Sequence, residues 1–372
     1  MVEIKEVKNK SDLRKFILFP QKLYKDNDYY VPDMVGDEYY LLQKGHNPSL
    51  EFCELVMFLA YKDGQIVGRI AAFLNPRANE KFNNKRVRFT RVDFIDDFEV
   101  SSALFKAAED WARSKGMNEI HGPIGFSDLD KQGMLIEGFD RLSIMPSIYN
   151  AEYYQHHLDR LGYRKEADWI ECHVKVPESI DPKVQRMSDI ILRRTKTRLV
   201  TLKSMKEADP YVNSFFTLAN ECYADLYGQV PLDEAQFQQY ADKYLKMMDP
   251  RFVYFINDQN DKMIGLAMAM PSLSKALRRV HGRLFPFGWI DLLRAQKKGD
   301  TLDMYLVAIH PDYQTSGLAF VLINHMWELA MQYGFKWAET GPMLEENEKV
   351  AAIWKMFDKE QDKRRRCYVK AL

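Results

Sequence analysis

A glycine-containing turn between a predicted strand and a predicted helix carries the clearest chemistry in this sequence. Residues 304–309 (MYLVAI) are apolar and β-branched, which indicates a buried strand, and His310-Pro311-Asp312 ends it. The segment after Gly317 is apolar at helical spacing. A strand, a tight turn and a helix in this order direct main-chain N–H groups and the positive end of the helix dipole toward one point. Such an arrangement favours the binding of a diphosphate.

The turn resembles the signature of the GNAT (N-acetyltransferase) superfamily, which reads Arg or Gln, two residues, Gly, one residue, then Gly or Ala. Residues 314–319 (QTSGLA) match it in full, and residues 309–313 (IHPDY) resemble the family's strand exit. The resemblance is close in the second half of the chain and holds only in outline in the first. It implies acetyl-CoA or a longer acyl-CoA as donor and no metal. The amides that it implies for the pyrophosphate are those of Gln314, Thr315, Ser316, Gly317, Leu318 and Ala319.

The resemblance assigns roles to residues outside the turn as well. Backbone groups of Val307 and Ile309 would pair with the pantetheine arm like an added strand and polarise the thioester carbonyl. Asn347, after the next strand, matches an asparagine that commonly contacts the pantetheine region. Seven residues later the family often has a tyrosine that protonates the leaving thiolate, and this chain has Trp354 instead. An indole N–H donates hydrogen bonds but is no practical proton source.

Acyl transfer to an amine requires a base for the ammonium and an acid for the leaving thiolate. Because Trp354 cannot serve as the acid, the proton would come from Tyr305, Tyr368 or solvent. An alkylamine with a pKa near ~10 is only about 0.1% neutral at pH 7, so a base is useful. Glu339, near the end of a predicted strand, is the candidate base and His310 is the alternative. The alternatives to a catalytic role are that Glu339 is a surface carboxylate and that His310 only stabilises the turn.

The two halves of the chain repeat the same order of patterns: strand, helix, hairpin, strand, helix, strand, helix, strand. The matching pairs are residues 58–72 and 253–269, 97–104 and 312–319, 116–123 and 334–342, and 172–175 and 367–370. Coincidence among turn-rich segments is the alternative. The common order predicts two tandem GNAT-like domains at residues 1–178 and 190–372, joined near residues 177–190. Each is expected to be an α+β fold with a mixed, mostly antiparallel sheet flanked by helices.

The first copy lacks the residues that the diphosphate turn requires. Aligning the two turns places Glu99 opposite Gln314 and Ser102 opposite Gly317. A carboxylate repels a diphosphate, and a side chain replaces the glycine that permits close backbone approach. The sequence therefore predicts one coenzyme site per chain, in the second half.

Residues 274–298 form a basic and apolar insertion between the second hairpin and the binding strand. The segment has seven Lys or Arg residues against one acid, Asp291, interleaved with leucines and aromatic residues. This composition is typical of a segment that lies in a membrane interface or covers a hydrophobic channel. A helical insertion whose charges form a solvated face explains it equally well. Peripheral contact with the inner membrane surface and simple core packing both remain open.

Composition excludes several classes of protein. Lys plus Arg equals Asp plus Glu at 53 each, and no helix-turn-helix or zinc pattern occurs, so no nucleic-acid partner is expected. The four cysteines are scattered without metal-ligand spacing, which indicates reduced thiols in a cytoplasm. The charged start and the lack of an apolar run near ~20 residues predict neither a secretory signal nor a spanning helix.

Three functions fit these patterns. The first is an N-acyltransferase acting on a small-molecule or lipid amine, and the sequence is similar to long bacterial GNAT proteins such as the ceramide synthases, which N-acylate a long-chain base. The second is a non-catalytic acyl-CoA or lipid sensor, which Trp354 favours. The third, an aminoacyl-tRNA-dependent transferase, is disfavoured by the coenzyme turn.

Overall fold

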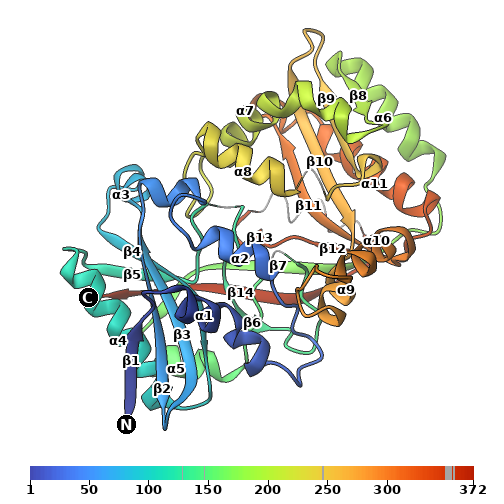
Figure 1. Ribbon diagram of the computed structural model, residues 1–372. Coiled ribbons are helices and arrows are strands. Elements are labelled where there is room, and N and C mark those ends of the chain that lie inside the picture. Colours follow the sequence, from blue (N-terminus) through green and yellow to red (C-terminus); the bar gives the residue numbers. More distant parts are fainter. Residues whose placement is uncertain (128, 146, 245–246, 348–353, 355–356) are drawn as a thin grey trace. The chain divides into compact units, whose positions relative to one another are not determined.

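The computed structural model describes all residues except 128, 146, 245–246, 348–353 and 355–356 (Figure 1). Contacts divide the chain into two units. Unit 1 comprises Met1–Ile170, Ser274–Leu292 and Asp362–Leu372, and unit 2 comprises Glu171–Leu273 and Leu293–Gln361. Each unit is therefore built from segments that are separated in sequence, and the C-terminal strand packs with unit 1. The predicted domain boundaries at 178 and 190 concern the sequence repeat and stay a prediction.

Unit 1 contains a mixed sheet with the order β1-β2-β3-β4-β5-β14-β7, and β6 pairs with β14. The pairing of β4 with β5 is parallel, and β1–β2, β2–β3, β3–β4 and β5–β14 are antiparallel. The strands are β1 (Val2–Glu6), β2 (Glu54–Lys62), β3 (Gln65–Leu74), β4 (Arg86–Phe94), β5 (Glu119–Gly122), β6 (Met134–Glu137), β7 (Arg164–Lys175) and β14 (Lys359–Ala371). Both central residues of the β2–β3 turn, Asp63 and Gly64, have positive φ, so the predicted hairpin is confirmed.

Helices cover both faces of the unit 1 sheet. They are α1 (Lys10–Leu23), α2 (Val35–Leu41), α3 (Pro76–Lys81), α4 (Phe98–Ser114), α5 (Tyr153–Arg160) and α9 (Ser274–Arg279), with the short 3-10 helix η1 (Pro48–Glu51). Ala60 of β2 packs in the cluster that contains Leu104 of α4, whereas the preceding Leu59 packs with Phe16 of α1. Because successive strand residues point to opposite faces, α4 and α1 lie on opposite sides of the sheet.

Unit 2 contains a second mixed sheet with the order β7-β12-β11-β10-β9-β8. Its strands, besides the last part of β7, are β8 (Arg198–Thr201), β9 (Val253–Asn257), β10 (Met263–Pro271), β11 (Thr301–Ile309) and β12 (Trp337–Thr340), and the short β13 (Met343–Leu344) pairs with β7. The β11–β12 pairing is parallel and the pairings β7–β12, β10–β11, β9–β10 and β8–β9 are antiparallel. Both units thus have the mixed, mostly antiparallel sheet that the sequence predicts.

The unit 2 sheet is also covered on both faces. Its helices are α6 (Pro182–Thr195), α7 (Val212–Tyr223), α8 (Glu234–Tyr244), α10 (Gly288–Lys298, which begins in unit 1) and α11 (Leu318–Gln332), with the 3-10 helices η2 (Met205–Tyr211), η3 (Pro250–Phe252) and η4 (Pro311–Tyr313). Tyr254 and Ile256 of β9 pack in the cluster that contains Leu322 of α11, whereas Phe255 contacts Tyr211 of η2. The side of α11 and the side of η2 are therefore opposite faces.

Residues 177–190, which the sequence suggested as a connecting stretch, largely form helix α6. Asp181 caps this helix by accepting a hydrogen bond from the Lys183 amide, and Pro182 occupies its first position. Asp and Pro are start signals at these positions, although the same residues also break helices elsewhere. Across the described part of the chain, no helix combines the length and apolar character needed to span a bilayer.

Candidate coenzyme and acyl-transfer site

The turn between β11 and α11 has a backbone shape that only glycine adopts easily. Strand β11 ends at Ile309, η4 follows, and Gly317 has φ 92° and ψ 2° immediately before α11 begins at Leu318. A Cβ atom on Gly317 would lie 3.0 Å from Cδ1 of Ile191 in α6. The left-handed backbone therefore favours glycine at this position, and a larger residue would also have to displace the end of the Ile191 side chain.

Some amides of this turn are engaged and others are left for a ligand. The amides of Gln314 and Ser316 donate to main-chain carbonyls of η4 at 3.3 and 3.0 Å, and the Leu318 amide donates to Ser316 Oγ at 3.3 Å. Among the described residues, the amides of Thr315, Gly317 and Ala319 have no such acceptor. Of the six predicted phosphate-binding amides, these three are the available donors.

Helix α11 adds a favourable field at the same point. It runs from Leu318 to Gln332, and its first N–H groups are the unsatisfied donors of a helix N-terminus. The partial positive charge at this end is roughly half an elementary charge. Together with the free amides, it makes the turn suitable for an anionic group.

Strand β11 has an unpaired edge that leads to this turn. Its parallel pairing with β12 ends at Met304 and Thr340, while β11 continues to Ile309. The His310 amide donates to Ile264 of β10 at 2.8 Å, so alternation directs the main-chain groups of Val307 and Ile309 away from β10. A register shift of β10 at Met268/Ala269 marks a bulge at Tyr305. These main-chain groups can accept an extended ligand as an added strand.

Glu339 is part of a carboxylate–imidazole pair. Nδ1 of His173, in β7, donates to Oε1 of Glu339, and the two side chains are 24% and 13% exposed. The imidazole stacks on Trp337 with ring centroids 4.4 Å apart. The sequence analysis missed His173, because nothing in its spacing from Glu339 indicates that β7 and β12 are neighbours. An imidazole oriented by a carboxylate can accept a proton on its second nitrogen.

The pair lies on the sheet face opposite α11. Glu339 is in register with His173 of β7 and with Asp303 of β11. Leu302 and Ala338, which alternate with these residues, pack in the core cluster of α11.

His310, the alternative base, has a structural role in the turn. Its Nδ1 accepts a hydrogen bond from the Asp312 amide at 3.3 Å, and Nε2 lies 3.2 Å from a carboxylate oxygen of Glu221. Nδ1 thus caps the start of η4, while Nε2 lies beside the Glu221 carboxylate. The turn interpretation of His310 is therefore the one that the geometry supports.

The remaining predicted residues lie in different surroundings. The Asn347 amide donates to Leu344 at 3.0 Å within a turn. Trp354 is 4% exposed and packs edge-to-face on Trp327, with ring centroids 6.5 Å apart, so it belongs to the unit 2 core. Tyr368, one of the alternative acids, is in the unit 1 core, where burial raises the pKa of its hydroxyl to about 12.

The turn of unit 1 differs from that of unit 2. Helix α4 begins at Phe98, directly after its N-cap Asp97, so the residues aligned with the coenzyme turn lie inside a regular helix. The Glu99 amide donates to Oδ1 of Asp97 at 2.9 Å, and the Val100 amide donates to the Asp97 carbonyl at 3.1 Å. The Glu99 carboxylate is 3.1 Å from Nζ of Lys62. The first-turn amides are therefore used by the protein itself.

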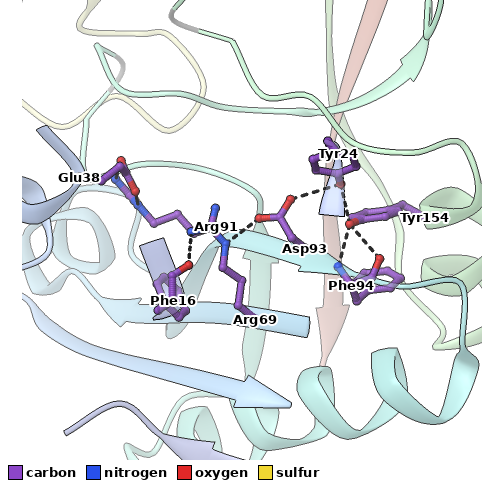
Figure 2. Close-up of polar contacts among 8 residues, drawn as sticks. All are labelled: Phe16, Tyr24, Glu38, Arg69, Arg91, Asp93, Phe94 and Tyr154. Atoms are coloured by element: carbon purple, nitrogen blue, oxygen red, sulfur yellow. Dashed lines mark hydrogen bonds and ion pairs between the residues drawn. The ribbon is translucent and has the colours of Figure 1, made fainter. Parts of the chain in front are cut away.

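A buried polar network lies beside β4 of unit 1 (Figure 2). Nε of Arg69 donates to Asp93 at 2.7 Å, and its Nη1 donates to the Phe16 carbonyl at 2.8 Å. The hydroxyls of Tyr24 and Tyr154 are 2.8 Å apart, and Tyr24 donates to Asp93 at 3.3 Å. Burial raises the pKa of Asp93 despite the neighbouring guanidinium.

A second ion pair extends the unit 1 network. Arg91, which has φ 47°, donates to both carboxylate oxygens of Glu38 at 2.8 and 3.0 Å. Burial alone would raise the pKa of Glu38, but the charge and hydrogen bonds of Arg91 outweigh it and lower the pKa to about 2. The charges beside β4 thus satisfy one another.

Comparison with known proteins finds similarity in both sequence and fold. A profile of the Acetyltransferase (GNAT) family matches residues 212–356. Protein YghO of Escherichia coli is 28% identical over 98% of this chain and 94% of its own length, and the bacterial ceramide synthase of Caulobacter vibrioides is 27% identical over 98% and 96%. A tandem GNAT protein from the clavulanic acid pathway superposes with a TM-score of 0.58 at 12% identity, covering 100% of this chain and 98% of its own.

Proposed function

We propose that this chain, whose residues 212–356 match the Acetyltransferase (GNAT) family, moves an acetyl or longer acyl group from coenzyme A to an amine. The turn at Gly317 is the observation that carries the proposal. Its amides at Thr315, Gly317 and Ala319 have no internal acceptor and lie at the N-terminus of α11. These donors would bind the coenzyme pyrophosphate.

The proposed reaction follows from the groups around β11 and β12. The amine nitrogen attacks the thioester carbonyl carbon, a C–N bond forms, and the C–S bond breaks as the thiolate leaves. Main-chain groups at Val307 and Ile309 would align the pantetheine arm and polarise the carbonyl. The Glu339–His173 pair would accept one proton of the ammonium. The second proton would reach the thiolate through Tyr305 or water, since Trp354 is buried in the core.

A lipid amine, such as a long-chain base, is the acceptor that we propose. The Caulobacter relative carries the name ceramide synthase, and the insertion at 274–298 exposes large apolar side chains. Phe285 is 82% exposed, Phe287 71% and Trp289 46%. Aromatic residues flanked by Lys and Arg favour the interface of an anionic bilayer. We therefore propose that the protein is cytoplasmic and that this segment contacts the surface of the inner membrane peripherally.

Donor binding tests the proposal directly. Replacing Gly317 with Glu should abolish binding of acetyl-CoA and palmitoyl-CoA in calorimetric titrations, because a carboxylate would occupy the cradle. Gly334→Glu is the matched control: Gly334 also has positive φ, and a Cβ there meets nothing within 4 Å. Retained binding in Gly317→Glu, or equal loss in both variants, would place the site elsewhere.

A non-catalytic acyl-CoA sensor is the second candidate, favoured by one observation. The family's usual tyrosine position holds Trp354, whose ring packs on Trp327 in the core. Tight binding of palmitoyl-CoA without release of free thiol, across a panel of amines that includes sphinganine, would select the sensor.

A further inference from the structure

Helix α6 presents a basic outer face. Its inner face is fixed in unit 2, because Ile191 packs in the core cluster of α11 and Ser188 is buried. The outer side chains follow one another at intervals of three and four residues, which places them on one side of the helix. They are Lys183, Arg186, Met187, Ile190, Arg193 and Arg194, and one exposed acid, Asp189, lies at the edge of this face.

This face combines unpaired cations with exposed apolar groups. Met187 and Ile190 are each 50% exposed. Within the described part of the chain, the four cations of this face form no salt bridge, and the hydrogen bonds of Arg193 and Arg194 go to main-chain carbonyls. Cations around a small apolar centre are suited to an acidic protein helix rather than to water alone.

The basic face ends at the proposed coenzyme turn. Nη2 of Arg194 donates to the Ser316 carbonyl at 2.8 Å, and Ile191 lies against Gly317. At about 1.5 Å per residue, Arg186 and Lys183 lie roughly 12 and 16 Å farther along the helix axis. A partner on α6 would therefore sit beside the phosphate donors without occupying them.

We propose that the outer face of α6 docks an acidic acyl carrier protein, which presents the acyl group on its phosphopantetheine arm. The proposal rests on the proposed function, since the arm would use the same turn and the same edge of β11. A carrier-bound arm and coenzyme A share the phosphate and the pantetheine thioester. They differ in what lies beyond the phosphate, which is a nucleotide in one case and an acidic protein surface in the other.

The location of the face favours a carrier over a membrane. An anionic bilayer would satisfy the cations of α6 but would bring no thioester to the turn that Arg194 contacts. A docked carrier does both. During transfer the C–S bond to the carrier's arm breaks, a C–N bond to the acceptor amine forms, and the carrier leaves with a free thiol that has taken one proton of the amine.

Binding measurements with two donors test the inference without knowledge of the acceptor. Labelled palmitoyl-acyl carrier protein and palmitoyl-CoA are titrated separately against the full-length protein, the double variant Lys183→Glu/Arg186→Glu, and the control Lys10→Glu/Lys44→Glu. The control residues are exposed cations of unit 1. Reversing the two charges on α6 should weaken carrier binding at least about tenfold and change palmitoyl-CoA binding less than about twofold. The loss of carrier binding should be larger than in the control variant.

Each outcome separates the two proposals. Absence of carrier binding, or equal weakening in both double variants, overturns the carrier inference. Binding to phosphatidylglycerol vesicles is measured for the same variants. If the α6 double variant loses vesicle binding but binds the carrier as tightly as the wild type, the carrier inference is overturned in favour of a membrane. Failure of palmitoyl-CoA to bind contradicts the proposed coenzyme site. A carrier that binds in an α6-dependent manner would then still support the inference.

Discussion

The two units share the order of their main strands but differ in the segment that joins a strand to the following helix, which is β4 to α4 in unit 1 and β11 to α11 in unit 2. In unit 1, helix α4 begins directly after Asp97, and the aligned residues 99–104 are helical. In unit 2, the 3-10 helix η4 and Gly317 delay the start of α11 until Leu318. This short delay leaves main-chain amides unsatisfied. A phosphate cradle in this fold therefore depends on where the helix begins rather than on the sheet.

The two units also differ in whether their charged side chains are buried or partly exposed. Unit 1 buries Arg69, Asp93 and Glu38 in a network that satisfies itself. Unit 2 places the partly exposed pair of Glu339 and His173 beside the strand whose edge is open. One unit therefore buries its charges in the packing, whereas the other keeps a partly exposed carboxylate–imidazole pair.

The largest effect is expected from breaking the unit 1 network. Arg69→Ala leaves Asp93 buried without its cation and should lower the free energy of unfolding by about 3–5 kcal/mol. Urea denaturation at pH 7 measures this loss. The control is Asp110→Ala, which breaks an exposed pair with Lys106 and should cost under about 1 kcal/mol. Similar losses in both variants would show that the network does not hold unit 1 together.

The next largest effect is expected on catalysis, and it compares Glu339 of unit 2 with His121, the residue at the corresponding position of unit 1. Glu339→Gln should lower kcat for palmitoyl-CoA and sphinganine about 100-fold, with donor binding unchanged, because His173 loses its orienting carboxylate. His121 of β5, at the corresponding register position, is the control. It is buried, which lowers its pKa well below the ordinary value, and His121→Gln should leave kcat per folded molecule unchanged. An unchanged kcat in Glu339→Gln would contradict a catalytic role of the carboxylate.

Acid should weaken unit 1 through Glu38. The pKa of this carboxyl is lowered from 4.5 to about 2, so its contribution is present above pH 4.5 and is lost as pH falls toward 2. Between pH 7 and pH 3 the loss should be about 2 kcal/mol. Urea titrations of the wild type and Glu38→Gln measure it, and the variant should show the smaller dependence on pH. Equal slopes would contradict the assigned pairing with Arg91.

The smallest effect tests whether glycine alone restores a cradle. Ser102→Gly places glycine at the unit 1 position aligned with Gly317, but inside α4. The change should cost about 1 kcal/mol of stability, and calorimetry should still count one palmitoyl-CoA per chain. A stoichiometry of two would show that residue type matters more than the start of the helix.

Sequence patterns predicted the elements of the fold well, because their signals are local. The hairpin at 58–72 depends on the Asp63-Gly64 turn, and the strand, turn and helix at 304–330 follow from periodicity and Gly317. Helix α6 begins inside the predicted joining stretch at 177–190, because Asp181 and Pro182 together form a helix start. The sequence suggested Glu339 alone as a candidate base, because the residue that it contacts, His173, is far away in sequence.

The sequence by itself determined where the chain turns and which segments alternate, since steric and hydrophobic preferences act over a few residues. It also identified the turn around Gly317, whose glycine is left-handed in the structure. Only the tertiary structure decided which amides of that turn stay free, that His173 meets Glu339, that Trp354 lies in the core, and that the last strand packs with unit 1. Those facts depend on pairings between distant strands, whose register is set by the packing of the whole sheet.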